Sequence, residues 1–216
     1  MKRTSWASLA SGSAMLAGML ISLAVAAGCS GPLQGTATPT RFYLLQCEAS
    51  PEKGLARDTK APILGTLGIG PVGLPEYLKR PQVVTRDGSR KIALSVFDHW
   101  GEPLDAGVAR VLTTALVRHQ QVHHMSIQPR AFHDTLEYRL WIDINRFDGA
   151  PGGELILAGR WSIRNASRGA PADWHDFFQR QLVDGESIEA LVAAHSAALE
   201  RLAADLAVAI KRRYSP

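Results

Sequence analysis

A glycine pattern in the first half of the chain could hold a phosphate group. Gly68, Gly70 and Gly73 match the spacing GxGxxG. In dinucleotide-binding folds this spacing opens a helix whose backbone amides hold a pyrophosphate. Here Pro71 and Pro75 stand in or beside the pattern, and proline removes amide donors and interrupts helices. We therefore interpret the glycines as points where a strand bends, and we expect no dinucleotide site.

Three histidines, His119, His123 and His124, could bind a metal ion. A helical pair of ligands four residues apart, such as His119 and His123, needs one continuous helix, but the helix should end near His123. No neighbouring cysteine or carboxylate supplies an obvious third ligand, so we interpret these residues as solvated histidines near a helix end. A GxSxG motif for a serine nucleophile is absent. The sequence predicts no enzyme, no metal and no cofactor.

Cys29 has the setting of a lipid attachment site. It follows a short basic start, an apolar run over residues 14–27 and the small residues Ala26-Ala27-Gly28. The run has the length of a secretory signal and is shorter than a membrane span. The junction resembles the lipobox of bacterial lipoproteins, whose cysteine thiol receives diacylglycerol before cleavage. We predict a lipoprotein signal peptide over residues 1–28, with an ordinary cleaved signal and a cysteine nearby by chance as the alternative.

The residues after Cys29 predict where the protein lies. In lipoproteins of Gram-negative bacteria an aspartate directly after the cysteine commonly signals inner-membrane retention, and none stands here. We predict an outer-membrane lipoprotein that faces the periplasm. Residues 29–40 hold the lipidated cysteine and a polar, proline-containing tether. The eleven residues from 30 to 40 span at most about 35 Å, so the domain over residues 41–216 stays close to its membrane.

The composition of the mature chain bounds its partners. Cleavage leaves 216 − 28 = 188 residues, enough for one domain with its own core. Removal of Lys2 and Arg3 lowers the formal net charge from +4 to +2, which gives little support to a nucleic-acid partner. Cys47 is then the only cysteine without a lipid. It ends an apolar run, and we expect a buried, unreactive thiol.

Alternating apolar residues predict most of the chain to be strands. Asp87-Gly88 is typical of a hairpin turn, and residues 148–153 join a second, clearer hairpin. The predicted strands cover residues 41–47, 62–72, 82–86, 91–96, 125–128, 137–147, 154–164 and 175–183.

Two segments have helical spacing instead. Pro103 suits the first turn of one helix, which Gly107 weakens, and Ser187 caps a longer one. The sequence therefore predicts an α+β fold: a single domain with a largely antiparallel or mixed sheet and two long helices packed against it. The apolar faces consist of Leu104, Val108, Val111, Leu112, Ala115 and His119 in the first helix, and of Ile188, Leu191, Val192, His195, Leu199, Leu202, Leu206 and Ile210 in the second.

Several segments together resemble the ABC-type transport auxiliary lipoproteins, the PqiC/YmbA-like family. Their order and spacing cover nearly the whole mature domain, although each segment is weak evidence alone. The segments are Phe42-Tyr43-Leu44-Leu45, Leu67-Gly68-Ile69-Gly70-Pro71-Val72, Leu74-Pro75-Glu76-Tyr77-Leu78, Arg80-Pro81-Gln82-Val83-Val84-Thr85-Arg86, Trp100-Gly101-Glu102-Pro103-Leu104, and Arg146-Phe147-Asp148-Gly149 leading to Gly152-Gly153.

The resemblance implies a non-catalytic accessory subunit of a lipid-transport system. Its partners would be a protein with an MCE (mammalian cell entry) domain and, through it, an inner-membrane permease and ATPase. Tyr77 and Trp100 are the candidate partner-interface residues, because aromatic side chains beside proline often anchor contacts. The alternative is that both residues belong to the core. The oligomeric state is left open, with a homo-oligomer among the alternatives.

Other functions compete with this hypothesis. A structural lipoprotein of envelope assembly would bind a β-barrel or a cell-wall component, and co-purification would separate that case. A lipid-binding carrier with its own cavity would retain lipid through purification. An envelope hydrolase is the least supported, since the sequence holds no catalytic constellation.

Overall fold

The structure is a computed structural model that describes residues 38–47, 64–86, 90–119, 122–127, 136–165 and 173–214. Its contacts divide the chain into two units, Met1–Thr38 and Pro39–Pro216, and the fold below is that of the second unit. The predicted signal peptide, the lipid attachment site at Cys29 and most of the tether lie outside the described residues, as do the turn residues Asp87 and Gly88.

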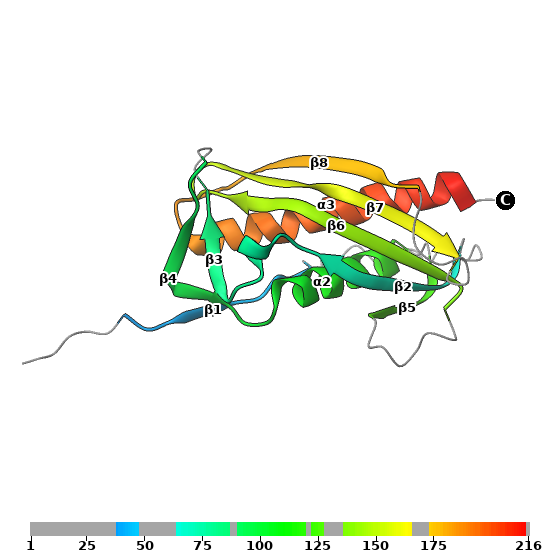
Figure 1. Cartoon of the computed structure of the whole chain (residues 1–216), viewed down its shortest axis with the longest axis horizontal. Helices are drawn as coiled ribbons and strands as arrows, with labels where there is room; N and C mark the ends of the chain where they lie inside the picture. Colours follow the sequence, from blue (N-terminus) through cyan, green and yellow to red (C-terminus); the bar gives the residue numbers. More distant parts are fainter. Residues whose placement is uncertain are drawn as a thin grey trace, which may run out of the picture. The chain divides into compact units, whose positions relative to one another are not determined.

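Eight strands in the described part of the chain form one mixed sheet (Figure 1). Three pairings are antiparallel, β3 with β4, β6 with β7 and β7 with β8, whereas β1–β4, β2–β5, β2–β6 and β3–β6 are parallel. The strands are β1 (Arg41–Tyr43), β2 (Leu64–Gly73), β3 (Gln82–Thr85), β4 (Ala93–Trp100), β5 (Val122–Ile127), β6 (Tyr138–Gly149), β7 (Glu154–Asn165) and β8 (His175–Leu182).

The long strand β6 organises the sheet. One of its edges pairs with β7 along almost its whole length. Its other edge pairs with β2 over residues 138–143 and with β3 only at Gly149. The sheet therefore divides beside β6 into a β2–β5 arm and a β3–β4–β1 arm, both built on one side of the predicted long hairpin.

A β-bulge in β6 explains why the buried apolar residues change from even-numbered to odd-numbered positions along the strand. Leu140, Ile142 and Ile144 are buried at every second position, as predicted. The β6–β7 register shifts between Ile144 and Arg146, and Phe147 is then fully buried. One extra residue at a bulge turns the following side chains over. The bulge thus places Phe147 and the adjacent Asp148 in the interior.

Two long helices pack against the sheet and against each other. They are α2 (Leu104–Arg118) and α3 (Ile188–Tyr214). The predicted cap is present, since the Ala190 amide donates to the Ser187 hydroxyl at 3.1 Å. Every predicted stripe residue of α3 is buried except Ile188, which packs against the core from its edge. The predicted α+β fold with two helices on a mixed sheet is confirmed.

The structure differs from the sequence prediction in local details. The strand expected over residues 41–47 ends at Tyr43, because the following backbone bonds to the helices instead: Leu45 accepts from Arg110, and Gln46 donates to Ser196. A 3-10 turn, η2 (Glu76–Leu78), was not anticipated. His119 has the spacing of the apolar face of its helix, but it is exposed at the C-cap of α2, which agrees with its interpretation as a solvated histidine.

Gly107, which weakens a helix in isolation, has a steric reason in α2. A Cβ atom at this buried position would lie 3.1 Å from Glu102 Oε1 and 3.4 Å from Leu45 Cδ1. A side chain at position 107 would therefore require the Glu102 carboxylate to move by a few tenths of an ångström, whereas the distance to Leu45 is an ordinary van der Waals contact. A second glycine, Gly152, adopts φ 67° in the β6–β7 turn, a conformation that glycine enters at little cost.

Candidate functional site

A groove opens between two loops at the β3–β4 arm of the sheet. One wall precedes β3 and holds Lys79, Arg80 and Pro81; the other is the β4–α2 loop that begins at Trp100. Its volume of about 510 Å³ falls in the range of small-ligand and side-chain pockets, roughly 300–1,000 Å³. The complete lining is Leu74, Lys79, Arg80, Pro81, Trp100, Gly101, Glu102, Pro103, Leu104 and Asp105.

The groove has an apolar floor and a mixed polar rim. Leu74, Trp100 and Leu104 are buried and belong to the hydrophobic core, so the floor is held by the core itself. On the rim Lys79 and Asp105 are exposed, and the Arg80 Nε is buried without a hydrogen-bond partner in the described structure. An apolar floor with few convergent polar groups is the usual composition of a binding site.

Backbone hydrogen bonds fix the two walls relative to each other. The Trp100 amide donates to the Pro81 carbonyl at 2.6 Å, and the Gly101 amide donates to the Tyr43 carbonyl at 2.7 Å. At the far end of the loop Glu102 is paired with Arg110 of α2. The groove is therefore a preformed part of the fold, held by β1, by the segment before β3 and by α2 together.

Trp100 lies in the core and borders the groove at the same time. Only 7% of its surface is exposed. Its ring meets the His195 ring of α3 edge to face, with centroids 5.5 Å apart and planes at 76°, and Phe147 meets the same imidazole at 4.5 Å. Aromatic pairs in such geometry contribute about 0.5–1.5 kcal/mol beyond their burial. Any partner in the groove would contact a tryptophan that is already rigidly placed.

His195 is a neutral histidine inside this aromatic cluster. Its Nδ1 lies 2.8 Å from the Leu191 carbonyl, and since a carbonyl can only accept, Nδ1 carries the proton. Burial lowers the pKa of His195 to about 4 because the interior disfavours the charged ring, against smaller opposing effects of the Leu191 and Phe147 backbone and of Asp148. Near neutral pH the ring therefore acts as a packed, uncharged core group.

Tyr77 positions the other wall of the groove. It lies in η2, directly before Lys79, and its hydroxyl donates to Asp148 Oδ2 at 2.5 Å. Arg86 and Arg146 each donate to Asp148 Oδ1 at 3.0 Å, so the fully buried carboxylate has three donors. Burial, and then the hydrogen bond to Asp148, raises the pKa of Tyr77 to about 12. The phenol thus holds η2 on the sheet as a neutral donor.

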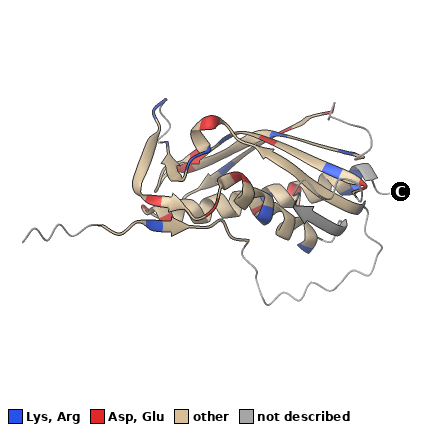
Figure 2. Cartoon of the chain, turned by 60° about the horizontal axis from the view of Figure 1, so that its bottom comes forward, with Lys and Arg blue, Asp and Glu red and all other residues tan. Residues whose placement is uncertain are grey.

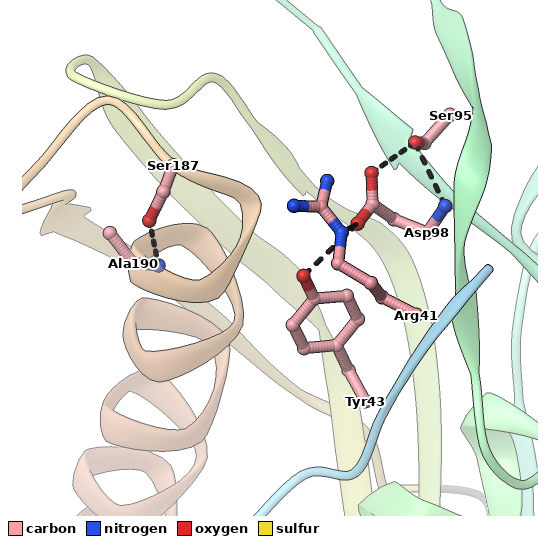
Figure 3. A network of polar contacts seen from close by, with 6 residues as sticks. All are labelled: Arg41, Tyr43, Ser95, Asp98, Ser187 and Ala190. Carbon is pink, nitrogen blue, oxygen red and sulfur yellow. Dashed lines mark hydrogen bonds and ion pairs between the residues drawn. The ribbon is translucent and has the colours of Figure 1, made fainter. Parts of the chain in front are cut away.

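A second buried carboxylate, Asp98, fixes the start of β1 (Figure 3). Arg41 and Tyr43 donate to its Oδ1 at 2.7 and 3.0 Å, and the Ser95 hydroxyl donates to its Oδ2 at 2.5 Å. Burial opposes ionisation of Asp98, but these hydrogen bonds outweigh it and lower its pKa. The first residues of the described domain are thereby tied to β4.

The other sequence candidates lie in β2, at the end of α2 and in β5. Gly68, Gly70 and Gly73 lie in the strand β2, as interpreted, and the β2–β6 register shifts between Ile69 and Val72, around Gly70. His119 is exposed at a helix end, as interpreted. The backbone of His123 and His124 lies in β5, and their side chains are outside the described part.

Cys47 is a half-buried thiol with a cationic neighbour. An Arg118 guanidinium nitrogen lies 2.9 Å from its Sγ. Burial, and then Glu200, raises the pKa of Cys47 to about 11 in spite of Arg118. The nucleophilic form of cysteine is the thiolate, and a raised pKa disfavours that form near neutral pH. The thiol is half-buried, whereas the sequence predicted a buried one.

Two further observations concern the described residues only. No group of three or more histidine, cysteine or acidic side chains there is arranged to hold a metal ion. None of the helices described is long and apolar enough to cross a membrane.

Sequence reasoning found Trp100 of the groove and Tyr77 beside its wall, and it missed the polar centres behind them. Trp100 and the loop that follows it were singled out by residue type, as was Tyr77. Asp98 and Asp148 were not, although an acidic residue that follows apolar ones in a predicted strand, as in Val96-Phe97-Asp98, is a signal that could have marked a buried carboxylate. Their donors come from distant segments, which no local pattern reveals.

The family model of the ABC-type transport auxiliary lipoprotein component matches residues 43–207. The match starts in β1 and ends in the last turns of α3, so it contains both walls of the groove, Asp98 and Asp148. The chain belongs to this family of ABC-type transport auxiliary lipoproteins. The expected resemblance is thereby confirmed, and the family is one of transport components rather than of enzymes.

Two solved structures share the fold of this auxiliary lipoprotein. A crystal structure of an uncharacterised protein has a TM-score of 0.62 at 16% identity and covers 80% of this chain and 99% of its own. A Xanthomonas campestris protein described under family DUF330 has a TM-score of 0.62 at 14% identity, with 78% and 93% covered. Identities this low show the fold alone. A comparison with curated proteins finds no match.

Proposed function

We propose that this auxiliary lipoprotein is a non-catalytic accessory subunit of an MCE/ABC-type system that moves lipids between membranes. Membership of the transport auxiliary family supports the general role. The observation that carries the proposal is the groove beside Trp100: a preformed, largely apolar recess with a charged rim suits the binding of a partner's side chains.

The groove gives Trp100 and Tyr77 different parts in the proposed contact. Trp100 forms part of the groove floor, which a side chain of the partner would contact. Tyr77 is outside the lining and acts by holding η2, whose following residues Lys79 and Arg80 form the wall. Hot spots of interfaces are typically aromatic residues in well-packed pockets with a polar surround. The partner we propose is the periplasmic part of an MCE-domain protein, which links the chain to the permease and ATPase.

The anchor is the second part of the proposal. Acylation of Cys29 would hold the chain on the periplasmic face of the outer membrane. The described domain begins at Pro39, so it would remain within the tether's reach of about 35 Å. An accessory subunit held in this way would bring the outer-membrane end of a transport conduit to its membrane.

The same groove favours one second candidate function, a lipid-binding carrier. Its volume of about 510 Å³ and its apolar floor would suit part of an acyl chain. Lipid extraction and mass spectrometry of the purified domain distinguish the two functions. Stoichiometric lipid would favour the carrier, and a lipid-free domain would favour the accessory subunit.

Quantitative co-isolation tests the proposed function in cells. The tagged full-length chain is cross-linked in intact cells, solubilised in mild detergent and analysed by mass spectrometry, with another outer-membrane lipoprotein as the reference. We expect enrichment of an MCE-domain protein together with its permease and ATPase. Enrichment of a β-barrel assembly or cell-wall protein instead would assign the chain to envelope assembly.

A further inference from the structure

Exposed apolar side chains gather on β1 and β4, next to the start of the domain. Phe42 on β1 is 69% exposed and Val96 on β4 is 72% exposed. The two strands are paired in parallel, and the Phe42 and His99 rings lie 5.9 Å apart. The full set, here called the β1–β4 patch, is Phe42, Leu44, Leu94, Val96 and Phe97, with Ile92 beside it.

The β1–β4 patch is an unusual surface for a strand edge. β1 pairs with β4 only over residues 98–100, so residues 93–97 of β4 have no strand on that side within the described structure. Proteins commonly protect such edges with charges, prolines or short strands. Here the exposed edge carries leucine, valine and phenylalanine, and an exposed apolar patch of this kind marks an interaction site.

A local irregularity presents these side chains outward. The β3–β4 register shifts between Gln82 and Val84. On the β4 side of this shift, the Asp98 amide donates to the Ser95 hydroxyl at 3.1 Å. This hydrogen bond closes a bend over the two residues between Ser95 and Asp98. Those residues, Val96 and Phe97, are consecutive and both exposed, whereas regular alternation would turn one of them inward. The bend is part of the same Asp98 network that holds β1.

The patch lies where the chain emerges toward its proposed anchor. The ion pair between Arg41 and Asp98 fixes the first strand residue, and Phe42 follows it directly. Only eleven residues separate the proposed acylated cysteine from Arg41. A flexible chain of this length has an end-to-end distance of about 20 Å. With the proposed anchor, the β4–β1 end of the domain, at the left of Figure 1, would be held near the bilayer.

We infer that the β1–β4 patch docks on the bilayer that holds the acyl chains, an inference that rests on the proposed anchoring at Cys29. Its occupant is the lipid surface: aromatic and aliphatic side chains enter the boundary between headgroups and acyl chains, typically to about 5–10 Å. Arg90 and Lys91, both exposed in the β3–β4 connection, can lie at headgroup level with their stems along the apolar region; this connection carries blue segments in Figure 2.

Docking would convert a loose tether into a fixed orientation. Because the acyl chains already hold the protein at the membrane, the effective concentration of the bilayer near the domain is high. Even a small apolar patch can then bind the bilayer, since it does not have to bring the protein to the membrane by itself. The groove and the β1–β4 patch are adjacent, because Gly101 of the groove wall lies beside Leu44 of the patch. A docked domain would therefore hold the groove at a constant height and angle above the bilayer.

Tryptophan quenching by brominated lipid tests this inference directly. The acylated full-length protein, as purified from membranes, is reconstituted into phosphatidylethanolamine–phosphatidylglycerol vesicles with or without bromine on the acyl chains. One variant is Val96→Trp, and the matched control is Leu182→Trp, since Leu182 is 73% exposed on the opposite edge strand β8. Emission of the added tryptophan is obtained by subtracting the spectrum of the parent protein in the same vesicles.

The inference predicts about a twofold loss of emission for Val96→Trp in brominated vesicles and little loss for Leu182→Trp, because only an immersed side chain approaches the bromines. Flotation of the protein with the vesicles without selective quenching overturns the inference and leaves the anchor intact. Self-association that Val96→Asp abolishes, together with absent quenching, would show a second copy on the patch instead. Failure to float would refute the anchoring and the inference with it.

Discussion

The hydroxyl of Tyr77 and the buried carboxylate of Asp148 are joined by a hydrogen bond of 2.5 Å that spans 71 residues of sequence. Tyr77 lies in the short turn η2 before β3, and Asp148 lies at the end of β6. This bond connects one wall of the groove to the central strand of the sheet. Tyr77 thus contributes to the groove by fixing the position of the wall residues that follow it in the chain.

Replacing Tyr77 with phenylalanine should destabilise the domain without removing the ring. Hydrogen bonds to charged groups contribute roughly 1.5–3 kcal/mol, and we expect a loss of about 2 kcal/mol in the free energy of unfolding. Chemical denaturation measures it. Lys79→Ala on the same turn breaks only the exposed ion pair with Glu76 and should cost less than about 1 kcal/mol. Equal losses for the two variants would contradict the assigned role of Asp148.

Replacing Trp100 with alanine should have a larger effect. The indole is buried against His195 and the core, and truncation of a buried tryptophan costs about 3–5 kcal/mol. Trp141→Ala, which removes a half-buried ring beside Arg139, provides the comparison and should cost clearly less. An unchanged free energy of unfolding for Trp100→Ala would mean that the indole does not pack as described.

The buried His195 should make stability depend on pH. Its pKa is about 4 in the folded state and 6.5 in the reference state, so between these values the unfolded chain binds more protons. The contribution of the neutral His195 to the free energy of unfolding is therefore fully present above about pH 6.5. It is lost as the pH falls toward 4, and the total loss is about 3 kcal/mol. The lowered pKa of Asp98 adds a loss of the same sign at still lower pH.

The variant His195→Asn tests this origin of the pH dependence. Its amide can still donate to the Leu191 carbonyl, which accepts from the histidine at 2.8 Å, but it does not titrate. Denaturation midpoints between pH 7 and pH 4.5 should change much less for this variant than for the parent chain. The same slope in both proteins would assign the pH dependence to other groups.

Cys29 carries the proposed membrane anchor. Cys29→Ala should abolish incorporation of labelled palmitate and leave the signal peptide uncleaved by the lipoprotein peptidase. Labelling in cells followed by fractionation measures both, and Cys47→Ala is the matched control because Cys47 is a half-buried thiol of the folded domain. Undiminished label in the Cys29→Ala protein would place the lipid on another residue.

The fold was largely accessible from the sequence because its elements have strong local patterns. Leu140, Ile142 and Ile144 alternate along β6, and the apolar stripe of α3 from Leu191 to Ile210 repeats with helical spacing. Those periodicities predicted both helices and the long hairpin. The parallel pairing of β2 with β6 and of β1 with β4 depends on contacts between distant segments, which periodicity does not encode.

The candidate site was only partly accessible for the same reason. Residue types identified Trp100 and Tyr77, but the groove between their loops exists because the Trp100 amide bonds to Pro81 and Tyr77 bonds to Asp148. The end of β1 at Tyr43 likewise follows from hydrogen bonds to two helices. In each case a backbone or side-chain group from a remote segment completes the geometry.

Binding of the purified domain to the periplasmic part of its MCE-domain partner tests the central claim most directly. The groove variant carries Lys79→Glu and Asp105→Lys on the exposed rim. A control of equal net charge carries Lys211→Glu and Asp176→Lys, both exposed outside the groove lining. Calorimetry should show binding by the parent chain and the control, and a loss of at least about thirtyfold in affinity, or about 2 kcal/mol, for the groove variant. No binding by the parent chain, or equal affinity of the groove variant and the control, would contradict the account.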